Sequence, residues 1–349
     1  MYDLLVLGGL GVDIRVRVPD LPLPVVDSVT VEPIDLRIGN TGAGVVLAAH
    51  ALGLRVAVVD TLGTDPAGDV VRAALSRTGV HAVLASTPAG TRRSVNLVDP
   101  AGRRMSLYDP RPSDGTAPFP VAQVATLVRQ ATHVHLSIMN WVRDLLPALG
   151  DMLGEGVGSS TDLHDWDGQN PYHRPFAEVA ELVLVSGVAL GTRTTAAPAP
   201  LNDSAREMPA ASDDPTMVTA TAPGDPARVL PDAPGNLARV LPDAPGDPAR
   251  VLPDALGDLA AAQRPVLVTW GADGADLHLG GVVTRIPAAT PPGPVVDTNG
   301  AGDAFAAGII AARSRGATWG EAAEYAARVA AAACTHDGME YPPGLLPRP

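Results

Sequence analysis

The 349-residue sequence contains no lysine, and its 25 basic residues other than histidine are all arginines. Without lysine, the chain cannot build a Walker-type Gly-Lys-Ser/Thr loop, use the lysine of a protein kinase or form a Schiff base through a lysine. Any phosphate that this protein binds must therefore be held by backbone amides, by arginine or by a metal ion.

Cysteine is nearly absent, and long apolar runs and excess positive charge are missing. Cys334 is the only cysteine, which excludes a disulfide framework and a cysteine-based metal site. No apolar run reaches the length of a membrane span, and the chain starts on a strand pattern instead of a signal peptide, so we expect a soluble, cytoplasmic protein. A net charge of -13 argues against nucleic acid and anionic membrane as partners.

The most informative stretch runs from Asp297 to Phe305 and combines a glycine-rich turn with a carboxylate. Val295 and Val296 are predicted to end a strand, and residues 304–313 are almost wholly small or apolar, which predicts a buried helix. The backbone amides of Gly300, Ala301 and Gly302 would then lie at a helix N-terminus, where they can surround a phosphate that the helix dipole also attracts. The turn is thus a predicted anion hole.

Asp303 follows this turn directly. A carboxylate beside an anion site is electrostatically unfavourable unless it has a task, and the evident task is to take a proton from a hydroxyl that attacks phosphorus. The alternative is an aspartate that only caps the helix. The spacing of this turn alone leaves both interpretations open.

The remaining sequence alternates between strand and helix patterns. Apolar strands are predicted at 4–8, 56–60, 133–137 and 182–186, with helices at 41–52 and 68–79. This alternation predicts an α/β fold with a mostly parallel central sheet between two helix layers, a three-layer α/β/α arrangement in one domain spanning 1–349. The segments 13–37 and 91–109 break the pattern, and we interpret them as a small β-sheet lid.

Residues 191–262 change in character and read as a low-complexity loop inserted between core elements. Within it, an eleven-residue unit rich in proline repeats over 223–255. Its prolines exclude a helix, so disorder or extended polyproline-like structure is expected. A tandem duplication without a role is favoured over a docking segment because loops tolerate insertions at little cost.

Several motifs together resemble the ribokinase-like (PfkB) carbohydrate kinases. Asp297-Thr298-Asn299-Gly300-Ala301-Gly302-Asp303 matches the family's Asp-Thr-Thr-Gly-Ala-Gly-Asp at all but one position. Gly63-Thr64-Asp65-Pro66-Ala67-Gly68 is similar to its Gly-x-Asp-x-x-Gly turn, and Thr269-Trp270-Gly271-Ala272-Asp273-Gly274 to its Thr-x-Gly-x-x-Gly. The motifs follow the family's order over nearly the whole chain.

The resemblance implies an ATP-dependent kinase that phosphorylates a hydroxymethyl group of a sugar, sugar derivative or nucleoside. It implies ATP and Mg²⁺, with K⁺ as a further ion, and a lid that closes on the sugar and pairs with the lid of a second copy. Asp303 would be the catalytic base. The other implied site residues are Asp13, Gly39 and Asn40 for the acceptor, Thr269, Gly271 and Gly274 for the nucleotide, and Asp297 and Asn299 for the monovalent cation.

The sequence departs from the family pattern at two places. Asn40 replaces a glycine and Gly44 replaces the asparagine that ordinarily touches the sugar, so we expect a bulkier acceptor than ribose. Ser186-Gly187-Val188-Ala189 lacks the family's Asn-x-x-Glu, which suggests that Asp162 holds Mg²⁺ through water or that the ATP phosphates hold it alone. A catalytically weak or silent sugar-binding or nucleotide-binding regulator is the alternative.

A metal hydrolase is a third hypothesis. His133 and His135 alternate onto one face of a predicted strand, and His164 lies on a later loop. Because no third ligand has the usual spacing, hydrogen-bonded core histidines are favoured.

Overall fold

The structure, a computed structural model, describes residues 1–100, 104–111, 118–150, 152–153, 156–191 and 254–349. These described residues belong to one compact unit. The strands are β1 Leu4–Leu7, β2 Gly11–Arg17, β3 Asp35–Gly39, β4 Val56–Leu62, β5 His81–Ser86, β6 Arg93–Val98, β7 Arg104–Asp109, β8 His133–Leu136, β9 Gly158–Leu163, β10 Leu182–Ser186, β11 Val266–Thr269, β12 Ala275–Leu279 and β13 Val282–Ile286. The helices are α1 Thr41–Ala51, α2 Pro66–Ser76, α3 Val121–Val128, α4 Asn140–Leu149, α5 Arg174–Val179, α6 Gly187–Gly191, α7 Asp254–Ala261, the 3-10 helix η2 Gly271–Asp273, α8 Ala301–Arg313 and α9 Trp319–Ala333.

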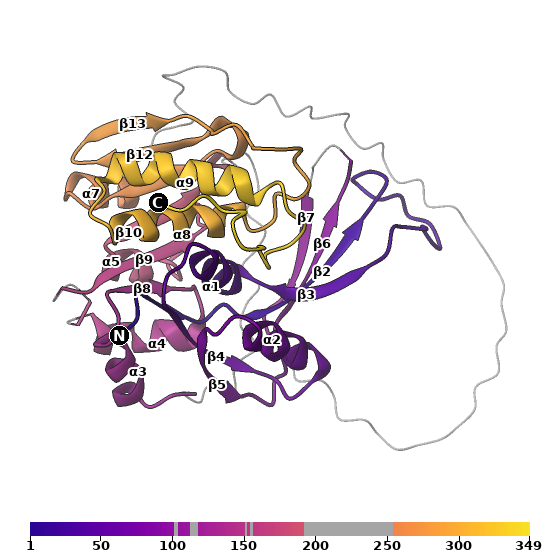
Figure 1. The fold of residues 1–349 in the computed structure, drawn as a ribbon, viewed down its shortest axis with the longest axis horizontal. Helices are drawn as coiled ribbons and strands as arrows, with labels where there is room; N and C mark the ends of the chain where they lie inside the picture. Colours follow the sequence, from indigo (N-terminus) through magenta and orange to yellow (C-terminus); the bar gives the residue numbers. More distant parts are fainter. Residues whose placement is uncertain (101–103, 112–117, 151, 154–155, 192–253) are drawn as a thin grey trace, which may run out of the picture. The chain divides into compact units, whose positions relative to one another are not determined.

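Strands β13-β12-β11-β10-β9-β8-β1-β4-β5 hydrogen-bond in that order to form the main sheet (Figure 1). The strands from β11 to β5 are mutually parallel, while β12 and β13 add antiparallel strands at one edge. Because β1, β4, β8, β9, β10 and β11 run the same way, their carboxyl ends meet at one edge of the sheet. In an α/β fold that edge is the usual place for a binding site.

Helices cover both faces of this sheet. One apolar core joins α1, α2, α8 and α9 to alternate residues of the strands, such as Leu4 and Val6. A second core joins α3, α4, α5 and α7 to the residues in between, such as Leu5 and Leu7. The strands are therefore buried on both faces, and this explains why they read as continuous apolar runs. The predicted three-layer α/β/α fold with a mostly parallel sheet is confirmed.

Helices α2 and α9 begin with side-chain caps that their sequences supply. Asp65 accepts a hydrogen bond from the Gly68 N–H and precedes Pro66 at the first turn of α2. Thr318 and Glu321 form a capping box at the start of α9. Where α8 and α9 cross, Gly308 lies against Ala326, and a side chain at residue 308 would begin 2.9 Å from the Ala326 Cα. Small residues thus allow the two helices to pack closely.

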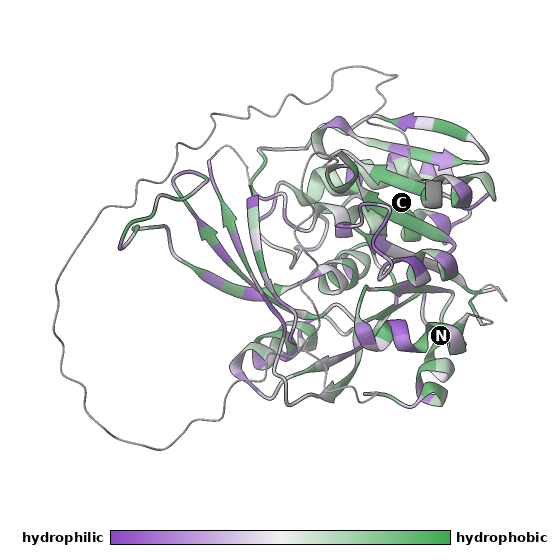
Figure 2. Ribbon diagram, turned by 180° about the vertical axis from the view of Figure 1, so that it is seen from behind, coloured by the Kyte–Doolittle hydropathy of each residue, from purple (hydrophilic) through white to green (hydrophobic). Residues whose placement is uncertain are grey.

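Strands β3-β2-β6-β7 form a smaller sheet of their own (Figure 1). These strands lie in or next to the segments 13–37 and 91–109, which the sequence predicted to be strands outside the main sheet. Figure 2 shows that polar and apolar residues mix along these strands, whereas the central strands of the main sheet are consistently apolar. Such alternation is expected for a sheet whose two faces meet different surroundings.

Two predictions about local structure were wrong. Val295 and Val296 do not end a strand, because they lie in an irregular segment in which the Val296 N–H donates to the Cys334 carbonyl. The predicted loop 191–262 ends too late, since residues 254–261 form α7 and bury Leu256 and Ala260 in the core. Most of that loop, including repeat residues 223–253, lies outside the described residues.

Among the helices of the described part, none is long and apolar enough to cross a membrane.

Candidate active site

The predicted anion turn lies at the N-terminus of α8. Gly300 is the N-cap residue and has a φ of 78°, in the left-handed region that glycine adopts without strain. A side chain there would also begin 2.7 Å from Cγ of Met339. At Gly302, by contrast, no described atom lies within 4 Å of where a side chain would begin. The backbone at Gly302 is thus open to close approach.

The amides of this turn differ in how they are used. The Ala301 N–H already donates to the Thr298 carbonyl at 3.3 Å. The N–H groups of Gly302 and Asp303 have no acceptor among the described residues, as expected in the first turn of a helix. Two free amides and the positive end of α8 therefore form a position where an anion can bind. Ala301 was also predicted to contribute, but its N–H is already used and would contribute least.

Asp303 is buried and lies against helix α1. A side chain at Gly44 would begin 2.0 Å from Oδ2 of Asp303. Gly44, which departs from the family pattern, therefore leaves room for the carboxylate. Burial raises the pKa of Asp303 well above its ordinary value, and the negative charges of Asp162 and Asp13 raise it further. A carboxylate with a raised pKa is a stronger base once it is ionised.

Asp13 and the turn meet through Asn299. The Asn299 Nδ2 donates to Oδ2 of Asp13 at 3.0 Å, and Nη1 of Arg104 donates to Oδ1 of Asn299 at the same distance. Burial raises the pKa of Asp13, while hydrogen bonds from Asn299, Asn40 and Ser94 and the charge of Arg104 oppose that rise. Asp13 thus lies next to the anion turn, and the side-chain amide of Asn299 holds one of its carboxylate oxygens.

Gly39 and Asn40 border Asp13. A side chain at Gly39 would begin 2.2 Å from the Asp13 carboxyl carbon, so only glycine fits there. Asn40 has φ 71° and ψ 160°, a backbone region that is almost exclusive to glycine and costs on the order of 1–3 kcal/mol. Its Oδ1 accepts from Ser94 at 3.3 Å, while its Nδ2 is buried with no partner in the described part of the chain. A strained residue with an unpaired donor is typical of a ligand-binding position.

Asp162 stands near the end of β9, and its charge reaches Asp303. Burial raises the pKa of Asp162 too. In the described part of the chain, no three His, Cys, Asp or Glu side chains are placed to bind a metal by themselves. Mg²⁺ is usually held by one or two carboxylates together with substrate phosphates, so a single carboxylate beside an anion turn fits this ion.

Asp297 was predicted to hold a monovalent cation together with Asn299, and in the structure an arginine stands beside it. Its Oδ2 lies 2.7 Å from Nη1 of Arg15, and its Oδ1 accepts the Asn299 N–H at 2.8 Å. The Asn299 side chain turns toward Asp13 instead. A guanidinium already stands beside the carboxylate, and a second cation there would be repelled. We therefore assign no step to K⁺.

The residues predicted to bind the nucleotide lie together at the end of β11. Thr269 closes the strand and pairs with Ser186 of β10, while Gly271 begins η2 and Gly274 follows it, with φ of 59° and 88°. A side chain at Gly274 would begin 2.2 Å from the Ile286 carbonyl oxygen, so this turn requires glycine. The turn is at the same edge of the sheet as Asp162, two strands away.

The histidines have a structural role, as the sequence favoured. Ser160 Oγ contacts Nε2 of His133 at 2.8 Å and Nδ1 of His135 at 3.0 Å. Burial lowers the pKa of His133 to about 3 and that of His135 to about 4, so both are neutral at physiological pH. The metal-hydrolase hypothesis loses its support.

Sequence reasoning missed Arg15, Ser94 and Arg104, which reach the site from the small sheet. All three lie on the face of that sheet that also carries Asp13, because Asp13 pairs with Ser94 and Arg104 with Val98. The polar and apolar alternation of the segments was visible in the sequence. The register that aligns the polar positions of different strands was not.

Comparison with known proteins decides the family. The acarbose 7(IV)-phosphotransferase of Actinoplanes sp. is 37% identical over 335 residues, covering 95% of this chain and 92% of that protein. This chain belongs to the PfkB family of carbohydrate kinases. The model of the pfkB carbohydrate kinase family matches residues 238–343, which include the anion turn of this kinase. The resemblance inferred from the sequence is thereby confirmed.

Solved structures agree with the family. The microbiome-derived acarbose kinase Mak1 is 35% identical, with a TM-score of 0.70 over 97% of this chain and 94% of the other. An Arabidopsis thaliana ribokinase in complex with ribose and ATP is 18% identical, with a TM-score of 0.67 over 99% and 96% of the two chains. At that identity the ribokinase supports the fold alone. The prediction of a carbohydrate kinase is confirmed.

Proposed function

We propose that this kinase transfers the γ-phosphoryl group of ATP to a hydroxymethyl group of a carbohydrate, with Asp303 as the general base. The observation that carries the proposal is the buried carboxylate of Asp303, held against Gly44 at the edge of two free amides. Burying a carboxylate is costly, so this position is a poor one for a residue that only caps a helix and a suitable one for a general base.

Asp303 would take the proton of the acceptor hydroxyl while the hydroxyl oxygen forms a bond to the γ-phosphorus. The bond from that phosphorus to the bridging oxygen breaks, and ADP leaves with the electron pair. The amides of Gly302 and Asp303, with Gly300 shaping the turn, would stabilise the charge on the transferring group. Arg104, whose charge reaches Asp303, would attract the phosphates to this position.

Mg²⁺ supplies charge neutralisation along the phosphates when bound, and Asp162 would hold it through water. Thr269, Gly271 and Gly274 would shape the nucleotide side. Asp13 would accept hydrogen bonds from acceptor hydroxyls, next to Gly39 and Asn40.

We propose acarbose, the acceptor that two relatives above 30% identity carry in their names, in preference to free ribose. Asn40 and Gly44 support this choice. Asn40 holds an unpaired amide donor in a strained backbone where a glycine would be free of strain, and Gly44 offers no side chain to a small sugar.

The small sheet would act as the lid over the acceptor and pair with a second copy. Its inner face carries the polar residues of the site, whereas its outer face is apolar, and Leu36, Met105 and Leu107 are 44%, 50% and 50% exposed there. An apolar sheet face of this kind favours a homodimer that covers it.

The purified protein should be incubated with ATP, Mg²⁺ and acarbose, ribose or nucleosides in turn, with phosphorylated product detected by mass spectrometry. We expect acarbose to be phosphorylated and ribose to react poorly. Efficient, selective phosphorylation of ribose would overturn the choice of acceptor. Tight binding of ATP and acarbose without product would instead support a silent binding protein.

A further inference from the structure

The small sheet and the anion turn are joined by one arginine. Arg15 of β2 donates through Nη1 to Oδ2 of Asp297 at 2.7 Å and to Oδ1 of Asp337, and through Nη2 to the Val296 carbonyl at 3.4 Å. Asp297 is the first residue of the turn motif, and Asp337 lies in the loop after α9. A single lid side chain therefore contacts both segments that border the turn.

This ion pair is buried. The side chains of Arg15 and Asp297 are 15% and 4% exposed. Removing one partner of a buried pair leaves the other charge without compensation. Asp337 would still keep Arg37, whose Nη2 lies 2.9 Å from its Oδ2. Asp297 has no second cation among the described residues, so the effect of losing Arg15 falls on the turn.

Asp297 in turn shapes the backbone that leads into the anion hole. Its Oδ1 accepts the N–H of Asn299 at 2.8 Å, and its Oδ2 accepts the N–H of Gly338 at 3.3 Å. Asn299 directly precedes Gly300. A displacement of the Asp297 carboxylate would therefore displace the amides of Gly302 and Asp303.

The same strand also carries the acceptor residue. Asp13 and Arg15 are two positions apart on β2, so their side chains leave the strand on the same face. We propose that Arg15 is a positioning residue, which holds Asp297 and thereby sets the anion turn when the small sheet closes on the acceptor. This inference rests on the proposed function for the role of Asp13, and it assigns Arg15 the place predicted for a monovalent cation.

Closure and turn geometry are coupled in this arrangement. Without an acceptor, Asp13 has less to hold it over the site, Arg15 withdraws with the strand, and the amides are no longer aligned. Water then reacts poorly with the γ-phosphoryl group in place of the acceptor hydroxyl. The coupling limits futile hydrolysis of ATP.

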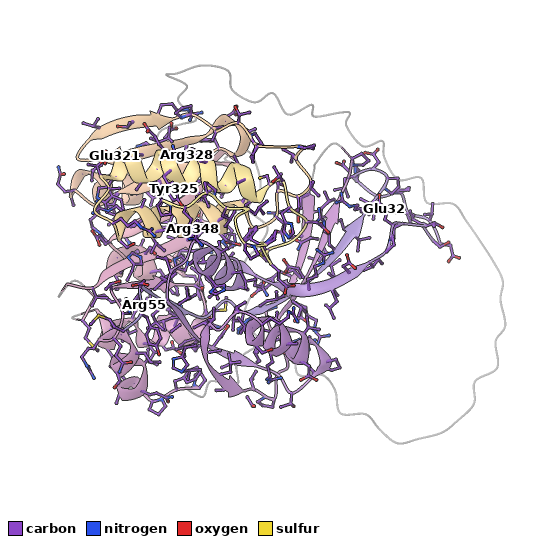
Figure 3. The ribbon with its side chains drawn as sticks, in the orientation of Figure 1. Glu32, Arg55, Glu321, Tyr325, Arg328 and Arg348 are labelled. Carbon is purple, nitrogen blue, oxygen red and sulfur yellow. The ribbon has the colours of Figure 1, made fainter. Side chains whose placement is uncertain are left out.

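The test compares Arg15→Ala with Arg17→Ala. Arg17 is the matched control because it lies on the same strand and face, is 38% exposed, reaches the Val296 carbonyl only at 3.5 Å, approaches Asp337 only to 3.9 Å and makes no contact with the Asp297 carboxylate. It also pairs with Glu32 at 3.4 Å, and Figure 3 labels Glu32 on the segment between β2 and β3. Its loss should leave Asp297 paired.

Hydrogen exchange of the amides at 297–303 gives a readout that needs no catalysis. Arg15→Ala should speed exchange there, while Arg17→Ala should match the unsubstituted protein. In the acarbose assay, Arg15→Ala should lower kcat on the order of 10²-fold, with a smaller effect on the KM for ATP. Added guanidinium should restore part of that loss, because it can re-occupy the space beside Asp297.

Unchanged exchange at 297–303 in a folded Arg15→Ala variant would overturn the proposal, and so would equal effects of the two substitutions. If Arg15→Ala fails to fold, Arg15→Lys keeps the charge but not the fork of donors, and the same exchange readout applies to it. A protein that phosphorylates no acceptor would refute the proposed function, and the exchange comparison would still decide the role of Arg15.

Discussion

The two sheets of this kinase are built on opposite plans. Strands of the main sheet bury both faces, as the fully buried Leu5 and Val6 illustrate. The small sheet turns polar residues such as Asp13 and Arg15 to one side and apolar ones such as Leu107 to the other. In the proposed function, the main sheet therefore fixes the position of the reacting groups, while the small sheet supplies contacts that can form and break.

The largest expected effect comes from the fixed part. Asp303→Asn should lower the rate of phosphoryl transfer on the order of 10²- to 10⁴-fold, because the amide is isosteric but cannot take the proton. The rate is measured under saturating ATP and acceptor. Asp165→Asn is the control, since that carboxylate is 61% exposed. Undiminished activity of Asp303→Asn would reduce Asp303 to a helix cap.

The two sheets should also differ in how much their apolar side chains contribute to the free energy of unfolding. Leu5→Ala should lower the free energy of unfolding by about 2–5 kcal/mol, because it leaves a cavity between sheet and helices. Leu107→Ala should cost less than about 0.5 kcal/mol in the monomer, since that side chain is half exposed. Denaturant titration of both variants measures the difference. Equal losses would mean that the outer face of the small sheet is covered in the monomer as well.

Contacts of the small sheet should govern acceptor affinity. Asp13→Ala should weaken acceptor binding by about 1–3 kcal/mol, since buried hydroxyls lose their acceptor. The affinity for ATP should stay the same, because Asp13 lies on the small sheet, which is the proposed lid over the acceptor. Calorimetric titration of each ligand tests this, and unaltered acceptor affinity would remove Asp13 from the site.

The smallest effect concerns pH and stability. The folded-state pKa of Asp303 is raised above the ordinary value of 3.8, so the folded protein binds this proton more tightly than the unfolded chain does. Its stabilising contribution is complete below pH 3.8 and is lost as the pH rises through the folded-state value. Asp303→Asn should thus raise the free energy of unfolding at neutral pH.

That gain should shrink as the pH falls toward 4, because the native carboxyl is then neutral as well. Thermal unfolding of the variant and the unsubstituted protein at several pH values measures it. A constant difference across pH would show that Asp303 titrates normally.

Much of the fold could be predicted because its signals are local. Apolar runs such as 56–59 and the glycine turn at 300–302 carry their structure in their own residues. The predicted strand end at Val295 and Val296 was wrong because two β-branched residues in an irregular segment look the same in sequence as the end of a strand. Helix α7 was missed because its first two residues belong to the proline-rich repeat.

The sequence proposed residues for the site but not the contacts between them. Asp13, Asn40 and Asp303 were expected together on family resemblance. The contact of Asn299 with Asp13 and that of Arg15 with Asp297 join residues more than 280 positions apart, and no local pattern reports them. Gly44 shows the same limit, because its role depends on the carboxylate that lies against it.

The pH dependence of single-turnover phosphoryl transfer to acarbose tests the central claim most directly. With Asp303 as the base, the rate should rise with pH through the raised pKa of its carboxyl and then level off, because only the ionised form accepts the proton. Asp303→Asn should be slow and flat over the same range. A rate in the unsubstituted protein that does not change with pH, or an Asp303→Asn variant with the same rising profile, would contradict the account.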